Sequence, residues 1–189
     1  MITGHVGVAY GLRAWRRDAS LLALLVAAVL PDILDVGYAA AGFCSPAGLY
    51  SHSLPAAGLL AALTLAVAAV WTRNTGVALV MAAAVLLHVP ADWITGFKYL
   101  WAGGPIVGLV LYLHAWLDLA LEVVVVAAGW RLLRRDPRAP RWATHWVALV
   151  ALFAAQATFD IVKGSGEPGK PSACGAAERA RLERLRDDS

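Results

Sequence analysis

Long apolar runs separated by short polar stretches dominate this sequence of 189 residues. Each run is close to the roughly 20 residues that an α-helix needs to cross the hydrocarbon core of a bilayer. A helix-like stretch from His5 to Trp15 precedes them and is too short to span. The pattern therefore predicts an all-α, polytopic membrane helix bundle with about five spanning helices and a short N-terminal helix. The predicted spans cover residues 19–42, 54–71, 76–94, 105–133 and 142–162.

The composition agrees with lipid as the main solvent of this chain. Hydrophobic residues make up 60% and charged residues 15% of the sequence, whereas a soluble domain is about 25% charged. The first polar break is a Gly/Pro-rich stretch from residue 164, and a helix with charges of both signs follows it. We therefore expect one transmembrane domain at 1–163 and a polar linker with an exposed charged helix at 164–189. The net charge of +3 is distributed over short loops, so no nucleic-acid partner is expected.

The basic residues fall at one set of helix ends. The opposite loops, at 43–53 and 95–104, contain Lys98 as their single lysine and no arginine. The positive-inside rule therefore places the arginine-rich loops in the cytoplasm. The many alanines and the excess of arginine over lysine are typical of a GC-rich bacterial genome, so we expect a multi-pass protein of the bacterial cytoplasmic (inner) membrane. The arginines concerned are Arg13, Arg16, Arg17, Arg73, Arg131, Arg134, Arg135, Arg138 and Arg141.

Several ionisable residues lie inside the predicted spans, where a charged side chain costs at least about 2.5 kcal/mol unless it is paired or hydrated. Counting from the basic loops at about 1.5 Å per residue places a set of them at a common depth, roughly 20–30 Å from the basic side. His145 lies at the cytoplasmic edge and is excluded. A common depth favours one shared site. The set consists of Asp32, His52, His88, Asp92, His114, Asp118 and Asp160.

Spacing sharpens this interpretation. Two histidines are each followed by an aspartate four residues later, in the pairs His88–Asp92 and His114–Asp118. Residues i and i+4 share one face of a helix, so each pair could bind one metal ion. In segment 32–35, two further carboxylates lie at i and i+3, again on one helix face. Imidazole with carboxylate is the ligand set of catalytic zinc or a similar divalent ion. The alternative is a set of hydrogen bonds between helices.

Four short motifs give the chain a family resemblance. They are Thr-Gly-His at 3–5, Leu-Pro-Asp-Ile-Leu-Asp at 30–35, Tyr-Ser-His-Ser at 50–53 and His-Val-Pro-Ala-Asp-Trp-Ile-Thr at 88–95. In this order they resemble the membrane-bound metal-dependent hydrolases, also called LexA-binding, inner-membrane-associated hydrolases. That family is distantly similar to the zinc-dependent phospholipase C and single-strand nuclease superfamily.

The resemblance implies a set of ligands in the order of that superfamily. In that superfamily a lone histidine stands between the last two ligand pairs, and the last pair ends in glutamate. This chain has no counterpart of that histidine, and its last pair ends in aspartate. We therefore expect one or two divalent ions, with zinc as the expected metal. By residue count His5 is shallower than the other ligands, so we expect the first residues to tilt or extend, with a bend at Gly4. The implied ligands are His5, Asp32, His52, His88, Asp92, His114 and Asp118.

The functional hypothesis is an integral-membrane metal-dependent hydrolase that uses a metal-activated water to cleave the phosphoester of a small molecule or a membrane lipid. Asp35 is expected to act as a general base or as an acceptor for a ligating imidazole. Ser51 and Ser53 flank His52 and could orient it, and Lys98 could meet a phosphate at the outer mouth. The alternatives are a transporter or a proton or metal relay, and a non-catalytic membrane scaffold.

Overall fold

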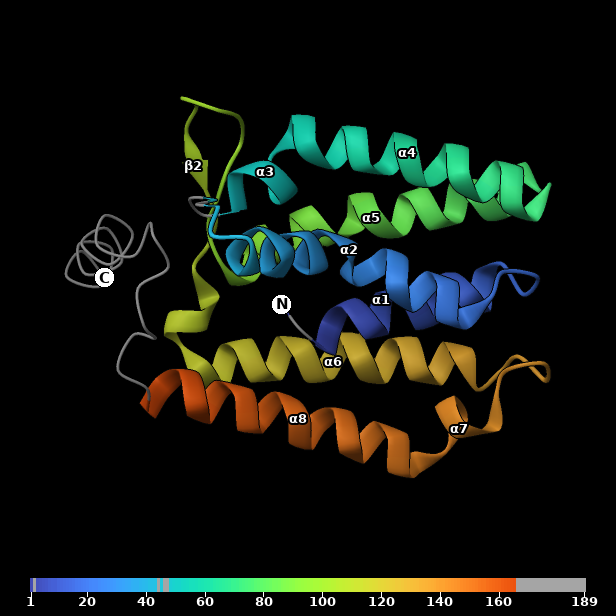
Figure 1. The fold of residues 1–189 in the computed structure, drawn as a ribbon. Helices are drawn as coiled ribbons and strands as arrows, with labels where there is room; N and C mark the ends of the chain where they lie inside the picture. The colour runs from blue at the N-terminus through green and yellow to red at the C-terminus, as the bar shows by residue number, and fades with distance from the viewer. Residues whose placement is uncertain (2, 44, 46–47, 166–189) are drawn as a thin grey trace.

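The structure of the protein, a computed structural model, describes residues 1, 3–43, 45 and 48–165. Helices form most of it and run along a common direction (Figure 1), which confirms the predicted helical architecture. The polar linker and charged helix predicted at 164–189 lie outside the described residues, apart from positions 164 and 165, which end the last helix. The helices are α1 (Thr3–Trp15), α2 (Leu21–Ala40), α3 (Leu49–His52), α4 (Leu54–Thr72), α5 (Thr75–Thr95), α6 (Ala115–Leu133), α7 (Arg141–Thr144) and α8 (Trp146–Ser165).

Within the described part of the chain, three helices, α2, α4 and α5, are long and apolar enough to cross a membrane. They coincide with the predicted spans at 19–42, 54–71 and 76–94. Large apolar side chains are exposed along α4, as expected of a helix that faces lipid, whereas α5 is mostly buried in the core. The exposed apolar residues of α4 include Leu59, Leu63, Val67 and Val70.

The basic loops of the sequence meet at one end of the bundle, opposite α3 (Figure 1). Asn74, the N-cap of α5, accepts a hydrogen bond from Arg16 at 3.3 Å and donates one to Asp18 at 3.0 Å. These bonds join the α1–α2 turn to the α4–α5 turn. A buried ion pair of 2.7 Å between Arg13 and Asp136 attaches the α6–α7 loop to the same end.

The span predicted at 105–133 is wrong in its first part. Strands β1 (Lys98–Tyr99) and β2 (Ile106–Val107) form a small antiparallel hairpin, and the 3₁₀ turn η2 (Leu111–Leu113) follows it. Helix α6 begins only at Ala115. The described part of the chain is therefore mostly helical, with a short two-stranded hairpin between α5 and α6.

A close crossing of two chain segments explains this departure from a helix. Gly108 has a φ of +153°, and a Cβ atom there would overlap the carbonyl oxygen of Gly96, directly after α5. An L-residue with a side chain neither adopts this backbone conformation readily nor fits at this distance. Short apolar runs occur in helices and strands alike, so hydrophobicity did not distinguish the two.

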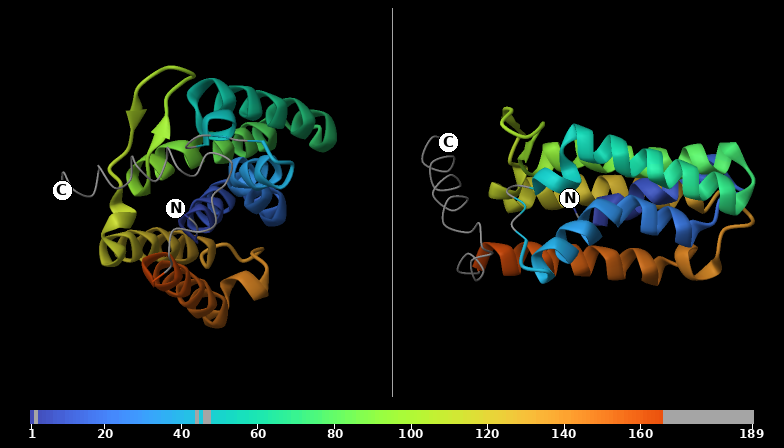
Figure 2. Two further views of the ribbon diagram at one scale, coloured as in Figure 1. Left: turned by 60° about the vertical axis from the view of Figure 1, so that its left-hand side comes forward. Right: turned by 45° about the horizontal axis from the view of Figure 1, so that its top comes forward.

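Helix α1 lies inside the bundle, and the N-terminus is surrounded by other helices (Figure 2). Gly7 of α1 packs against Gly129 of α6, and a Cβ atom on Gly7 would come within 2.6 Å of the Val125 carbonyl oxygen. Small residues that let two backbones approach this closely are typical of helix pairs in membranes.

The first turn of α1 is held by a carboxylate from another helix. Glu122 of α6 accepts hydrogen bonds from the Gly4 backbone N–H and, at 3.1 Å, from the Thr3 hydroxyl. A carboxylate at a helix N-terminus satisfies free N–H groups and interacts favourably with the helix dipole. Because Gly4 is part of this regular helix, the expected bend at Gly4 is wrong, and His5 is placed by the first turn of α1.

Candidate metal centre

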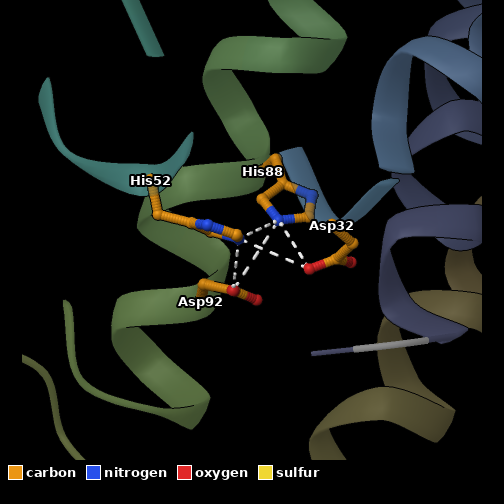
Figure 3. Close-up of side chains that lie close together, drawn as sticks. All are labelled: Asp32, His52, His88 and Asp92. Carbon is orange, nitrogen blue, oxygen red and sulfur yellow. Dashed lines mark hydrogen bonds and ion pairs between the residues drawn. The ribbon is translucent and has the colours of Figure 1, made fainter. Parts of the chain in front are cut away.

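Four of the predicted ligands converge at the end of the bundle away from the basic loops. Asp32 comes from α2, His52 from the last position of α3, and His88 and Asp92 from one face of α5 (Figure 3). One ligand atom from each residue lies within 4.8 Å of all the others. The His88–Asp92 pair on one helix face is as the four-residue spacing predicted.

The distances between these atoms fit a single small cation. The Nε2 atoms of His52 and His88 are 2.9 Å apart, and Asp32 Oδ1 lies 3.4 Å and 3.5 Å from them. Asp92 Oδ2 lies 3.2 Å and 3.6 Å from the same two nitrogens. Four atoms bound tetrahedrally at about 2.0–2.1 Å from zinc are about 3.3–3.4 Å apart. The group could therefore hold a metal ion.

The His88 ring is oriented by the backbone of α2. Its Nδ1 lies 2.7 Å from the carbonyl oxygen of Ala28. Because a carbonyl oxygen only accepts, Nδ1 carries a proton, and Nε2 is the ring atom that faces the centre.

The His52 ring is also held through its Nδ1 atom, in this case by side chains, so that its Nε2 faces the centre. Its Nδ1 lies 2.6 Å from Ser51 Oγ and 3.6 Å from Asp35 Oδ2. Ser51 Oγ donates to Asp35 Oδ1, so the serine oxygen is left to accept from Nδ1–H of His52. With both rings neutral in this tautomer, both Nε2 lone pairs would face the centre, an arrangement that suits a bound cation.

The loop before α3 leaves just enough room for this arrangement. Gly48 has a φ of +69°, and a Cβ atom there would lie 2.8 Å from His52 Nδ1 and 3.2 Å from Asp35 Oδ2. Neither Gly48 nor the Ala28 carbonyl was found from the sequence, since a backbone group that acts through a distant contact leaves no local signal. The orienting role expected for Ser51 agrees with the structure.

His5 lies beside the four residues. Its ring stacks on that of His88, with centroids 3.7 Å apart and planes at 15°, and its Nε2 lies 3.1 Å from Asp92 Oδ1. Burial lowers the pKa of the His5 imidazole to about 4, although the hydrogen bond to Asp92 acts in the opposite direction. The ring is therefore neutral near pH 7.

Positively charged groups also approach Asp92. Lys98 Nζ lies 3.2 Å from Oδ2, and the N-terminal amino group of Met1 donates to Oδ1 at 2.8 Å and to Thr95 Oγ1 at 2.7 Å. Asp92 thus has neighbours on both carboxylate oxygens, which holds its orientation toward the histidines.

The structure does not bring His114 and Asp118 into this group. His114 is exposed and lies at the N-cap of α6, with φ −112° and ψ 78°, so it is outside the helix that carries Asp118. The four-residue spacing therefore does not place the two side chains on one helix face. Asp118 is buried on α6, on the same side as Glu122.

Among the described residues of the candidate centre, the two aspartates of α2 are the most exposed. The side chain of Asp32 is 43% exposed and that of Asp35 29%, whereas His52 and His88 are inaccessible and Asp92 is 7% exposed. A small molecule would therefore reach the centre past Asp32. Comparison of the chain with protein-family models, with characterised proteins and with solved structures gives no match.

Proposed function

We propose that this chain is an integral-membrane metal-dependent hydrolase that cleaves a phosphoester, and that its centre holds zinc as one or two ions. The observation that carries the proposal is the opposed pair of Nε2 atoms of His52 and His88, 2.9 Å apart. Metal-ligating histidines are commonly oriented by a carbonyl or carboxylate on their other nitrogen. Here the Ala28 carbonyl orients His88, and Asp35 acts on His52 through the Ser51 hydroxyl. Asp32 and Asp92 each place a carboxylate oxygen within 3.6 Å of both nitrogens, which completes a set of four ligand atoms.

The residues around the centre divide into a buried and an open side. His52, His88 and Asp92 form the buried side, and Asp32 forms the side that a substrate approaches. A divalent ion bound here would supply a polarised phosphoryl group and a reactive water near neutral pH.

Two further residues have roles in this proposal. Asp35 positions His52 through Ser51, which is one of the two roles that the sequence allowed for it. Lys98 brings a positive charge to the centre and would neutralise a phosphate oxygen.

We also propose that five helices cross the bacterial cytoplasmic membrane, with α6 and α8 added to the three long apolar helices. Exposed apolar side chains on both, such as Val124 and Val150, support this placement. Tryptophans are exposed where helices reach the basic end, as in an interfacial belt. The positive-inside rule then places that end in the cytoplasm and the candidate centre toward the outer face. These tryptophans are Trp15, Trp71, Trp142 and Trp146.

The resemblance to the membrane-bound metal-dependent hydrolases supports the same function. All four converging residues come from the motifs that carry the resemblance, at 30–35, 50–53 and 88–95. Three segments distant in sequence thus supply one group of ligand atoms, as the resemblance implies.

A transporter or ion relay is less well supported by the packing. Between the centre and the basic end, α2 and α5 pack through Leu24, Ala28, Val77 and Val85, which are buried and apolar. The contact between α2 and α5, which carry Asp32, His88 and Asp92, therefore offers no row of polar side chains along which an ion or a proton could move.

Hydrolysis by the purified protein tests the proposal. In detergent we expect zinc-dependent cleavage of p-nitrophenyl phosphate or of phosphatidic acid, abolished by EDTA and restored by zinc. Lys98→Met should lower kcat/KM by about 10²-fold, and Lys98→Arg should retain more activity because the charge remains. Zinc-loaded protein that cleaves no phosphoester, but couples ion flux in vesicles, would support the transporter instead.

A further inference from the structure

An apolar groove lies between α2 and α4, with α5 beneath it. It has a volume of about 470 Å³ and is lined almost entirely by apolar atoms. Several of the lining side chains are themselves exposed, so the groove opens toward the surroundings of the bundle. The principal lining residues are Val26, Leu30, Leu63, Val67, Trp71 and Met81.

The groove runs along the membrane direction. Its lining on α2 extends from Ser20, at the basic end, to Leu30, which at 1.5 Å per residue is a length of about 15 Å. On the antiparallel α4 it extends from Trp71 back to Leu60. The groove therefore lies within the apolar part of the candidate spans and ends on the side of the candidate metal centre.

The groove ends about two helical turns of α5 from that centre. Met81 lines the groove, and His88 lies seven residues further along α5. Seven residues are close to two helical turns, so both side chains project from nearly the same face of α5, about 10 Å apart. Val85 between them is fully buried and apolar.

We propose that this groove binds one acyl chain of a membrane lipid whose phosphoester lies at the candidate metal centre. The choice of lipid substrate rests on the proposed function, whereas the acyl-chain site rests on the groove itself. A lipid of the outer leaflet has its head group outward and its chains toward the bilayer middle. The centre and the groove are arranged in the same order along α5.

The size of the groove favours an acyl chain over a helix of a partner. A helix with side chains is about 10 Å wide and would occupy roughly 1,200 Å³ over a length of about 15 Å. The groove, at about 470 Å³, is too small to enclose a helix, which could only rest on its rim. A single extended hydrocarbon chain is narrower and has no polar backbone to satisfy in an apolar lining.

Photocrosslinking tests this inference. The full chain is reconstituted in phosphatidylcholine vesicles that contain phosphatidic acid with a diazirine near the end of one acyl chain. Cross-links located by mass spectrometry should concentrate on Val26, Leu63 and Val67. Labels spread evenly over the exposed apolar positions of α4, including Leu59 and Val70 outside the groove, or no label in the groove, would overturn the proposal.

A pair of matched variants sharpens the test. Ala23→Phe fills the groove, whereas Ala62→Phe makes the same change at an exposed position of α4 outside the lining. Ala23→Phe should reduce groove cross-linking about tenfold, as expected when about two methylene groups no longer fit, and Ala62→Phe should not. Equal cross-linking in both folded variants would contradict the acyl-chain site.

Substrate length separates this inference from the proposed function. Ala23→Phe should slow cleavage of long-chain phosphatidic acid and leave cleavage of p-nitrophenyl phosphate unchanged. Specific groove labelling in a protein that hydrolyses neither compound would retain the acyl-chain site and reject the hydrolase.

Discussion

His52 and His88 face each other through their Nε2 atoms at 2.9 Å, while the Nδ1 atom of each ring is engaged on its far side. The two rings come from α3 and α5, and separate contacts hold each of them in place. Gly48, Ser51 and Asp35 orient His52, and the packing of α2 against α5 orients His88 through the Ala28 carbonyl.

Gly48→Ala should displace His52 and lower zinc affinity while the bundle remains folded. The new Cβ would lie 2.8 Å from His52 Nδ1, in a backbone conformation that strains an L-residue. Gly42→Ala is the matched control, because Gly42 also has a positive φ, of +76°, but nothing lies within 4 Å of its Cβ position. Zinc titration against a chelating dye measures both variants, and equal affinities would contradict the role of Gly48.

His5→Ala should weaken zinc binding by about 10–100-fold, the usual effect of removing a residue that orients a ligand. His5 stacks on His88 and contacts Asp92, so its loss frees two of the converging side chains. His114→Ala should leave zinc binding unchanged, because His114 is exposed and outside the group. Calorimetric zinc titration that ranks the two variants in the opposite order would restore His114 as a ligand.

Gly7→Ala should destabilise the protein by about 1–3 kcal/mol, the usual cost of overpacking. The added methyl group would press on the Val125 carbonyl at 2.6 Å and separate α1 from α6. Gly11→Ala, on the same helix with nothing near its Cβ position, should be neutral or stabilising because alanine favours helix. Thermal unfolding in detergent compares them, and similar midpoints would show that α1 and α6 are not in tight contact.

The orientation in the membrane can be measured by cysteine labelling of intact cells. In a chain whose two native cysteines are replaced by serine, Arg138→Cys, in the loop at the basic end, should be protected from an impermeant maleimide. Ala102→Cys, in the β1–β2 hairpin loop, should react. Position 138 is suitable because Arg138 is exposed, whereas neighbouring Asp136 is buried against Arg13. Labelling at 138 with protection at 102 would reverse the proposed topology.

Span length, hydrophobicity and residue spacing along the chain were sufficient to predict much of the fold and part of the candidate metal centre. The spans at 54–71 and 76–94 were predicted from length and hydrophobicity and end within one residue of α4 and α5. His88 and Asp92 could be paired from spacing alone because both lie well inside one helix. The same reasoning failed for His114, because α6 starts one residue after it.

Contacts between segments that are distant in sequence could not be predicted from the pattern of hydrophobic and polar residues. The hairpin and the late start of α6 follow from the crossing of Gly108 over Gly96, which no periodicity encodes. The placement of His5 depends on Glu122, more than a hundred residues away, which accepts from the backbone of Gly4. A buried carboxylate in a span looks the same in sequence whether it binds a metal or caps a helix.

The metal content of purified protein tests the central claim most directly. Wild type, His88→Ala and His145→Ala are purified in detergent, incubated with zinc, dialysed and analysed by mass spectrometry of the metal. His145 is the control because it is an exposed histidine at the basic end, far along the bundle from the centre. Wild type and His145→Ala should retain one or two zinc ions per chain, and His88→Ala should lose most of them. Folded wild type without zinc, or equal zinc in both variants, would contradict a metal centre at His52, His88, Asp32 and Asp92.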